Sequence, residues 1–542
     1  MFTSSRRGLT TARVADGVAM LVLLTISIIA VLTYRDYGLG WDDYTHAQYG
    51  DLLLKLYGSG FTDRRALSFV NLYAYGGGFD MLSALVAKVS GVDLFDTRRL
   101  VGATVGIIGL VVTWRLGRRV GGPTAGLIAL VLLATCPLYY GHMFMNAKDA
   151  PFAVAMTVML LGAVRIFEGY PAPSAATGVL FGIGLGLAIG TRVLGGLTLF
   201  PFLIALSLLI VHDTQTSNLR EALRRAGKFL FALLPALIIA YAVMALIWPW
   251  SVVAPLNPLR AAAYFSNFFE KPWKEMFDGA LVSVPDMPRT YVPQLFMLEM
   301  PEILLVLGLG GVAGALVATL QRDLPIERRS ILVFLAAAVI IPIAMTVILK
   351  PAMYNGIRHF VFVTPPLAIL GGLAGKWMLD RAASRQPLLA AATASAITAS
   401  FVLPVKEMAR LHPYQYTYFN WLAGGIQEND DRYMLDYWGL AFKQAAQELR
   451  TKLTDARDFP PGKHWRIAVC GPQRPAEVEL GPEFVTTWEP KAADFAMSLG
   501  EFYCAELKAP ILVEIEREGV IFARVYDIRG RTISSLLTIP PP

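Results

Sequence analysis

Long apolar segments recur along most of this chain, and they constrain its fold more than any other feature. Each is about 20 residues long, the length at which a helix crosses the ~30 Å hydrocarbon core of a membrane. Of the 542 residues, 55% are hydrophobic and 16% are charged, whereas soluble proteins carry about 25% charged residues. The sequence therefore predicts a mainly α-helical, polytopic membrane protein, and it excludes a disordered chain, a disulfide scaffold and an ordinary cytosolic enzyme.

Eleven segments are expected to span the membrane. The first has the full length of a span rather than that of a signal peptide, so we expect a retained anchor. The apolar segment 79–92 is only about 14 residues long, which favours an interfacial or re-entrant helix. The predicted spans are about 14–34, 98–116, 123–140, 150–167, 174–190, 193–212, 229–248, 301–320, 330–349, 359–375 and 387–404.

The basic residues of the short loops indicate the orientation. With the N-terminus in the cytoplasm, nearly every short basic loop lies on the cytoplasmic side, as the positive-inside rule requires. Counting 79–92 as a span would place Arg115, Arg118 and Arg119 outside. These loops carry much of the net charge of +7, and no run of Lys and Arg is interleaved with aromatic residues. We therefore expect the C-terminus outside and no nucleic-acid partner.

The outer face is expected to hold the long loops 35–97 and 249–300 and the polar tail. The 249–300 loop is rich in Trp, Phe, Pro and charged residues, a composition typical of a segment that lies on the membrane and covers a lipid. We predict a transmembrane catalytic domain over 1–420 and a small extracytoplasmic α/β domain over 421–542.

The predicted α/β domain has a helix and several short strands. Periodicity predicts a helix over 441–453 and strands over 465–470, 511–515 and 520–525. Cys470 and Cys504 also lie in this region, and a disulfide between them depends on an oxidising compartment, so the pairing stays open. The third cysteine, Cys136, is expected to be a small core residue.

An acidic pair, Asp42 and Asp43, directly follows the first span. Two carboxylates just after a membrane span are costly, and the other charged motifs on the same side favour a functional reading. Neighbouring residues in a turn point in different directions, so one can face a cavity while the other caps the helix expected near Tyr44. The alternative is that both only cap that helix.

A second charged motif, Asn146-Ala147-Lys148-Asp149, lies between two spans on the same side. Asp149 precedes Ala150-Pro151, where an acidic N-cap is also favoured, so capping alone could explain it. Lys148 could pair with a phosphate, and the alternative is a lysine that extends to the membrane surface.

A third cluster of cations lies at the outer edge of a late span. Lys350, Arg358 and His359 could form a site for a lipid phosphate, with bidentate bonds from arginine. The alternative is a positive rim that contacts ordinary phospholipid headgroups. Arg192 separates two spans on the same side, where it is either a phosphate ligand or a turn residue. No phosphate-binding loop of a nucleotide enzyme is found in the sequence.

These motifs together resemble the GT-C superfamily of membrane glycosyltransferases, in particular the bacterial branch of glycosyltransferase family 39, which is related to protein O-mannosyltransferases and lipid A aminoarabinose transferases. The resemblance covers about residues 10–420. Asp42-Asp43 matches the acidic pair of the first outer loop, where Asp-Glu is more usual. Asn146-Ala147-Lys148-Asp149 is close to an Asn-Pro-Lys-Asp pattern. Tyr354-Asn355-Gly356-Ile357-Arg358 and His412-Pro413-Tyr414 are similar to later loops of bacterial members.

The resemblance implies a glycosyltransferase of the bacterial inner membrane, with its C-terminal domain in the periplasm. It implies transfer of a sugar from a polyprenyl phosphate to a lipid, glycan or protein acceptor. On that basis Asp42 is expected to be the base of an inverting single displacement, and Asp43 the alternative base. Asp149 is expected to orient Lys148 or the acceptor. Lys148, Arg358, His359, Arg192 and Lys350 are expected to bind the donor phosphate.

No cofactor is required by this scheme, although Asp42, Asp43 and Asp149 could bind a divalent metal. Two other classes of function stay open from the sequence. A transporter or flippase of a lipid-linked substrate would show repeats with ionisable residues at mid-membrane, whereas these charges lie at one rim. A non-catalytic envelope assembly scaffold would make the C-terminal domain the active part.

Overall fold

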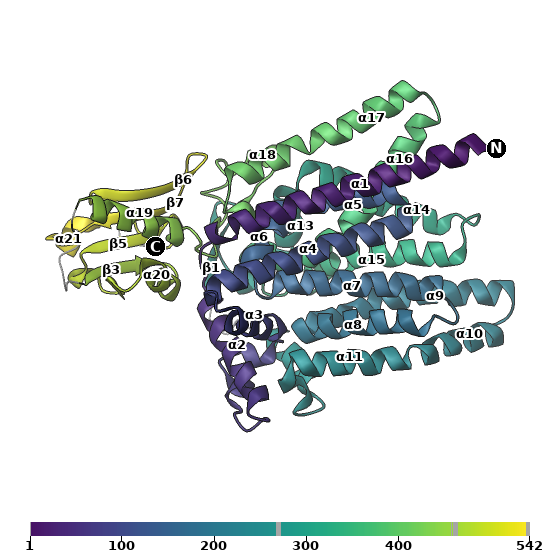
Figure 1. Cartoon of the computed structure of the whole chain (residues 1–542), viewed down its shortest axis with the longest axis horizontal. Coiled ribbons are helices and arrows are strands. Elements are labelled where there is room, and N and C mark those ends of the chain that lie inside the picture. Colours follow the sequence, from purple (N-terminus) through teal and green to yellow (C-terminus); the bar gives the residue numbers. More distant parts are fainter. Residues whose placement is uncertain (1, 267–272, 457, 459–463, 538–542) are drawn as a thin grey trace.

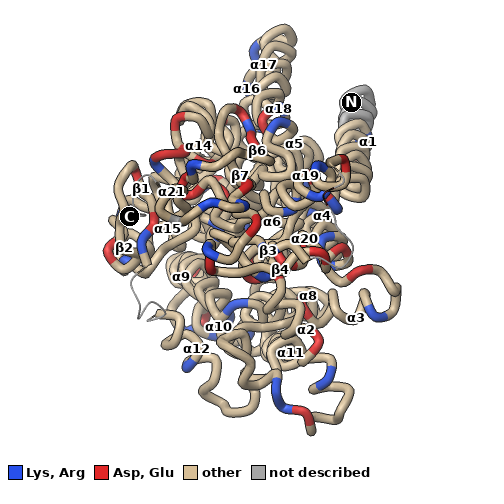
Figure 2. Tube along the Cα trace, turned by 90° about the vertical axis from the view of Figure 1, so that its left-hand side faces the viewer, with Lys and Arg blue, Asp and Glu red and all other residues tan. Residues whose placement is uncertain are grey.

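The structure is a computed structural model, and it describes residues 2–266, 273–456, 458 and 464–537. Figure 1 shows a bundle of long helices with a sheet domain at one end. The N-terminus of α1 lies at the opposite end of the bundle. Viewed from the sheet domain, charged residues gather in that domain and in the loops, whereas the bundle helices are mostly uncharged (Figure 2).

The bundle consists of helices that follow the predicted apolar segments. They are α1 (Phe2–Thr33), α4 (Leu94–Gly121), α5 (Pro123–Ala134), α6 (Pro137–Met145), α7 (Asp149–Glu168), α8 (Ala175–Thr191), α9 (Leu199–Thr216), α10 (Leu219–Ala232), α11 (Leu234–Ile247), α14 (Glu302–Leu320), α15 (Ile326–Leu349), α16 (Thr364–Ala383), α17 (Pro387–Ser400) and α18 (Val402–Arg410).

The chain is a multi-span membrane protein. In its described part, nine helices are long and apolar enough to cross a membrane. The pair α5 and α6 makes a tenth span if it counts as one, but it is bent by 63°, because Pro137 cannot donate the backbone hydrogen bond that would continue α5. The predicted segment 174–190 forms α8, a helix of 17 residues. The predicted count of eleven spans stays a prediction.

Small residues allow α8 to lie between two neighbours. Gly184 faces the backbone of Met159 in α7, and Gly182 and Gly186 face backbone atoms of Ala236 and Ala240 in α11. A side chain at any of the three positions would collide with that backbone, so these glycines permit close helix packing.

Shorter elements lie between the bundle and the sheet domain. Segment 79–92 forms α3 (Gly78–Ser90), which packs against α2 (Asp43–Gly58) and is not among the candidate spans. The 249–300 loop contains α12 (Asn257–Ser266), a hairpin of β1 (Lys274–Phe277) and β2 (Ala280–Ser283), and α13 (Tyr291–Glu299). Asp278 and Gly279 turn the hairpin with positive φ angles, as a two-residue turn of this type requires.

The C-terminal domain is a five-stranded mixed sheet. Its strand order is β4-β3-β5-β7-β6, with β3 parallel to β4 and β5 and with β7 antiparallel to β5 and β6. Its elements are α19 (Phe442–Asp455), β3 (Trp465–Cys470), α20 (Gln473–Leu480), β4 (Phe484–Thr487), β5 (Phe495–Leu499), β6 (Ile511–Arg517) and β7 (Val520–Asp527).

The predicted helix and three strands of this domain are confirmed, and β4 and β5 were missed. Every residue of β5 is buried, so this central strand has no polar alternation by which to recognise it. Further along, the loop that follows β5 is tied to the end of β3 by a disulfide between Cys470 and Cys504. Cys136 is a free, buried cysteine, as predicted.

Removing the disulfide is expected to destabilise the C-terminal domain. In the chain-entropy account, a cross-link between residues 34 positions apart contributes about 3–4 kcal/mol. The double variant Cys470→Ser/Cys504→Ser should therefore be cleaved faster in this domain by limited proteolysis. Wild-type protein treated with dithiothreitol should behave in the same way. Equal protease resistance of oxidised protein and double variant would contradict this expectation.

Candidate active site

A cavity of about 940 Å³ lies where the helix-connecting loops meet the C-terminal domain. Its walls come from the start of α2, the loop before α3, the turn between α6 and α7, the hairpin β1–β2, the loop after α15 and the C-terminal region. The lining residues are Trp41, Asp42, Thr45, His46, Val70, Asn71, Leu72, Tyr75, Lys148, Arg192, Trp273, Lys274, Leu281, Tyr354, Asn355, Arg358, Met434, Tyr437, Trp438, Phe502 and Tyr503.

Asp42 lines this cavity and pairs with Lys148. The Lys148 Nζ lies 3.3 Å from Asp42 Oδ2, and 43% of the Asp42 side chain is exposed. Burial opposes ionisation of Asp42, but the charges of Lys148, His46 and Arg358 outweigh it and lower its pKa to about 2. Asp42 is therefore a carboxylate over the whole physiological pH range, and it can only accept a hydrogen bond or a proton.

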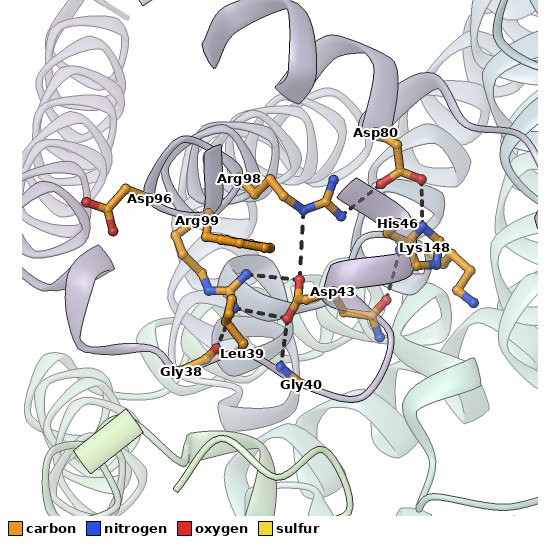
Figure 3. A network of polar contacts seen from close by, with 12 residues as sticks. Gly38, Leu39, Gly40, Asp43, His46, Asp80, Asp96, Arg98, Arg99 and Lys148 are labelled. Atoms are coloured by element: carbon orange, nitrogen blue, oxygen red, sulfur yellow. Dashed lines mark hydrogen bonds and ion pairs between the residues drawn. The ribbon is translucent and has the colours of Figure 1, made fainter. Parts of the chain in front are cut away.

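Asp43 points away from the cavity into a buried network of ion pairs (Figure 3). Its Oδ1 and Oδ2 accept hydrogen bonds from Arg99 at 3.1 and 3.0 Å, and Oδ2 also accepts one from the Gly40 N–H at 2.8 Å. Arg98 Nε lies 3.8 Å from Oδ1. One member of the acidic pair thus faces the cavity, as expected, while the other joins α2 to α4 instead of capping α2.

Asp149 is buried between two arginines. Its Oδ1 lies 2.5 Å from Arg192 Nη2, and its Oδ2 lies 3.3 Å from Arg358 Nη1. Asn146, and not Asp149, caps the start of α7. Its Oδ1 accepts hydrogen bonds from the backbone N–H groups of Lys148 and Asp149. Asp149 therefore orients Arg192 and Arg358, whereas its neighbour Lys148 pairs with Asp42.

Arg192 and Arg358 both line the cavity, so three predicted phosphate ligands, counting Lys148, converge there. The other two predicted phosphate ligands, Lys350 and His359, do not line the cavity. Lys350 is exposed at the end of α15 and does not line the cavity. His359 lies behind the cavity wall, with its ring packed edge-on against Tyr354 at 5.1 Å.

Aromatic side chains surround these cations. The sequence did not predict them as part of the site. Lys148 Nζ lies 4.8 Å from the ring centre of Tyr75, and the Arg358 guanidinium lies 4.9 Å from that of Trp438 and 5.0 Å from that of Tyr354. Such contacts stabilise cations at low exposure. Trp438 comes from the C-terminal region, about 400 residues from Asp42, so no local pattern in the sequence could connect the two.

Two buried glutamates hold the loop that carries Arg358. Glu275 of β1 accepts a hydrogen bond from the Asn355 N–H at 2.7 Å and one from the Tyr291 hydroxyl at 3.2 Å. Burial raises the pKa of Glu275 to about 7 and that of Glu299 well above its ordinary value. The hairpin of the 249–300 loop thereby fixes the backbone next to Arg358.

Metal binding was left open by the sequence. In the described part of the chain, no three His, Cys, Asp or Glu side chains are grouped so as to hold a metal ion. The three carboxylates in question are each engaged by a cationic side chain, namely Asp42 by Lys148, Asp43 by Arg99 and Asp149 by Arg192.

A family model of glycosyltransferases matches part of this chain. Residues 78–248 match the family model described as dolichyl-phosphate-mannose-protein mannosyltransferase. The matched segment includes Lys148, Asp149 and Arg192 and begins after Asp42. A comparison with curated proteins by sequence finds no match.

Solved structures of membrane glycosyltransferases share the fold. The oligosaccharyltransferase AglB from Archaeoglobus fulgidus, in complex with an inhibitory peptide and a dolichol-phosphate, is 13% identical with a TM-score of 0.50. The alignment covers 89% of this chain and 69% of that one. The apo form of an oligosaccharyltransferase from the same organism has a TM-score of 0.49 at 14% identity, and the alignment covers 88% of this chain but only 65% of that one.

ArnT from Cupriavidus metallidurans, bound to undecaprenyl phosphate, is 15% identical with a TM-score of 0.47. The alignment covers 94% of this chain and 97% of that one. The family match and the shared fold confirm the predicted resemblance to GT-C membrane glycosyltransferases.

Proposed function

We propose that this protein transfers a sugar from a polyprenyl phosphate to a hydroxyl group of an envelope acceptor, at the outer face of the bacterial inner membrane. The observation that carries the proposal is one cavity that combines an ionised carboxylate, Asp42, with three cations, Lys148, Arg192 and Arg358. Transfer from a phosphate ester needs both elements, because a proton must leave the acceptor while negative charge develops on the leaving phosphate.

Asp42 is the base in this proposal. Its carboxylate accepts the proton of the acceptor hydroxyl while the acceptor oxygen attacks the anomeric carbon, and the sugar–phosphate bond breaks with inversion. Asp43 is not assigned this role, because its oxygens are taken up by Arg99 and the Gly40 N–H. It instead fixes the start of α2, directly after Asp42.

The cations bind the donor phosphate and stabilise it as it leaves. Arg358 and Arg192 are held in place by Asp149, so they cost little reorganisation when the charge develops. No metal is needed in this scheme, because fixed cations offset the phosphate charge. A solved structure of AglB, which shares the fold, is in complex with a dolichol-phosphate, which supports a donor of this class.

An apolar groove supports a polyprenyl donor further. About 530 Å³ of open space lies between α9 and α15, lined by Phe200, Leu203, Ile204, Ser207, Ile341, Met345, Ile348 and Leu349. The chain segments that lead to this groove carry Arg192 just before α9 and Arg358 just after α15.

The proposal predicts a change in envelope composition. Mass spectrometry of envelope lipids, glycans and proteins from cells with and without this protein should show one glycosylated component that depends on it. Wild-type protein and Lys350→Gln should restore that component, and Asp42→Asn should not. An unchanged profile, or restoration by Asp42→Asn, would contradict the proposal.

A further inference from the structure

A buried histidine on the cavity wall has no place in the proposed reaction so far. His46 stands one helical turn after Asp42, and its backbone N–H donates to the Asp42 carbonyl at 2.9 Å. Both side chains line the cavity. Only 2% of His46 is exposed, so its ring is held in one environment and not in free solvent.

One ring nitrogen of His46 is fixed and the other is free. Nδ1 lies 2.6 Å from Asp80 Oδ2, and Asp80 Oδ1 accepts a hydrogen bond from Arg98 at 2.8 Å (Figure 3). Nε2 is buried and has no hydrogen-bond partner among the described residues. Buried polar atoms are nearly always satisfied, and an exception at a cavity wall points to a partner that arrives with the substrate.

The carboxylates around His46 are each paired with a cation. The negative charges of Asp43 and Asp80 are balanced by Arg98 and Arg99, and Asp42 is balanced by Lys148. Because an ionised Asp80 can only accept a hydrogen bond, the shared hydrogen sits on Nδ1. In a neutral ring of this tautomer, Nε2 carries a lone pair and is a proton acceptor.

We propose that His46 Nε2 is the final acceptor of the proton that leaves the acceptor hydroxyl, an inference that rests on the function proposed above. The acceptor oxygen forms its bond to the anomeric carbon, and the electron pair of the sugar–phosphate bond stays on the phosphate. The proton passes from the hydroxyl to the Asp42 carboxylate and from there to Nε2, and it is released to water after the products depart. Asp80 is the positioning residue, since it orients the ring and offsets the imidazolium charge.

The basicity of the two groups gives the transfer its direction. A carboxyl as acidic as Asp42 holds a proton poorly at neutral pH, and an imidazole is ordinarily a far stronger base than a carboxylate. The charged groups around His46 are Asp42 just before α2, Asp80 on α3, Arg98 on α4 and Lys148 in the turn before α7.

The test compares kcat of the wild type and of variants, with the polyprenyl-phosphate sugar fraction of the source membranes as donor. His46→Gln should lower kcat about 10²-fold. Asp80→Asn should also lower kcat, because it removes the carboxylate that orients the His46 ring, and Asp80→Glu should restore kcat in part.

A spectroscopic measurement tests the tautomer without turnover. In full-length protein labelled with [15N]histidine, the His46 signals, identified by their loss in His46→Gln, should show hydrogen on Nδ1 and none on Nε2 at pH 8. The opposite tautomer would overturn the inference. If Asp42→Asn is inactive but His46→Gln keeps the kcat of the wild type, this inference alone fails. If Asp42→Asn is active, the proposed function fails first.

Discussion

Asp42→Asn is expected to lower sugar transfer by about 10²- to 10⁴-fold and to leave binding of undecaprenyl phosphate intact. The amide keeps the shape of the carboxylate but cannot take a proton from the acceptor, and general-base catalysis contributes rates of this order. Donor binding should persist because Lys148, Arg192 and Arg358 remain in the cavity, and Lys148 loses a competing anion. Transfer is measured with the extracted donor fraction, and binding by the quenching of tryptophan fluorescence, since Trp41, Trp273 and Trp438 line the cavity.

Asp43→Asn is the matched control for this prediction, because it makes the same chemical change at the neighbouring residue. Asp43 is buried against Arg99 and Arg98, and breaking a buried ion pair costs about 3–5 kcal/mol. This variant should therefore unfold at lower temperature while its folded fraction retains most of its kcat. If Asp42→Asn were active and Asp43→Asn were stable but inactive, the base would be Asp43 and not Asp42.

Arg358→Gln is expected to weaken binding of undecaprenyl phosphate by about 10- to 10²-fold, since hydrogen bonds to charged groups contribute about 1.5–3 kcal/mol. The substitution should be tolerated by the fold, because Asp149 keeps its partner Arg192 at 2.5 Å. The dissociation constant is obtained by titrating the lipid phosphate into the protein in detergent and following tryptophan fluorescence.

Lys350→Gln is the control for Arg358→Gln. Both residues come from one short, cation-rich segment and look equivalent in sequence, but Lys350 is exposed at the end of α15 and outside the cavity. The dissociation constant of Lys350→Gln should equal that of the wild type. A loss of affinity in Lys350→Gln, or none in Arg358→Gln, would contradict the assignment of the phosphate site.

Much of the architecture follows from local patterns. Apolar segments of membrane length predict the helices because a span must satisfy all its backbone hydrogen bonds internally, so length and apolarity suffice. The break between α5 and α6 was missed because the apolar run continues through it, and only Pro137 marks the interruption. The missed strand β5 has no alternation, since both of its faces are buried.

The polar network around Asp43 could have been expected only in part. Arg98 and Arg99 lie at the edge of a predicted span, where charged residues are costly and therefore informative. Their partners Asp80 and Asp43 come from α3 and α2, however, and ordinary capping or surface exposure would explain each of the four residues separately. His46 carried no motif of its own, and the role proposed for it rests on its unpaired Nε2 and on the position of the residue in the cavity wall.

The sequence by itself determined that this is a membrane protein with a small α/β domain, and it identified charged residues of three loops as one candidate site. Those conclusions rest on composition, length and short-range pattern. The tertiary structure decided how the charges are paired: Lys148 with Asp42, Asp149 with Arg192 and Arg358, and Asp43 with Arg99. It also decided that Lys350 and His359 stay outside the cavity. Ion pairing depends on distances of a few ångströms between segments far apart in the chain, and only the packing of the helices sets those distances.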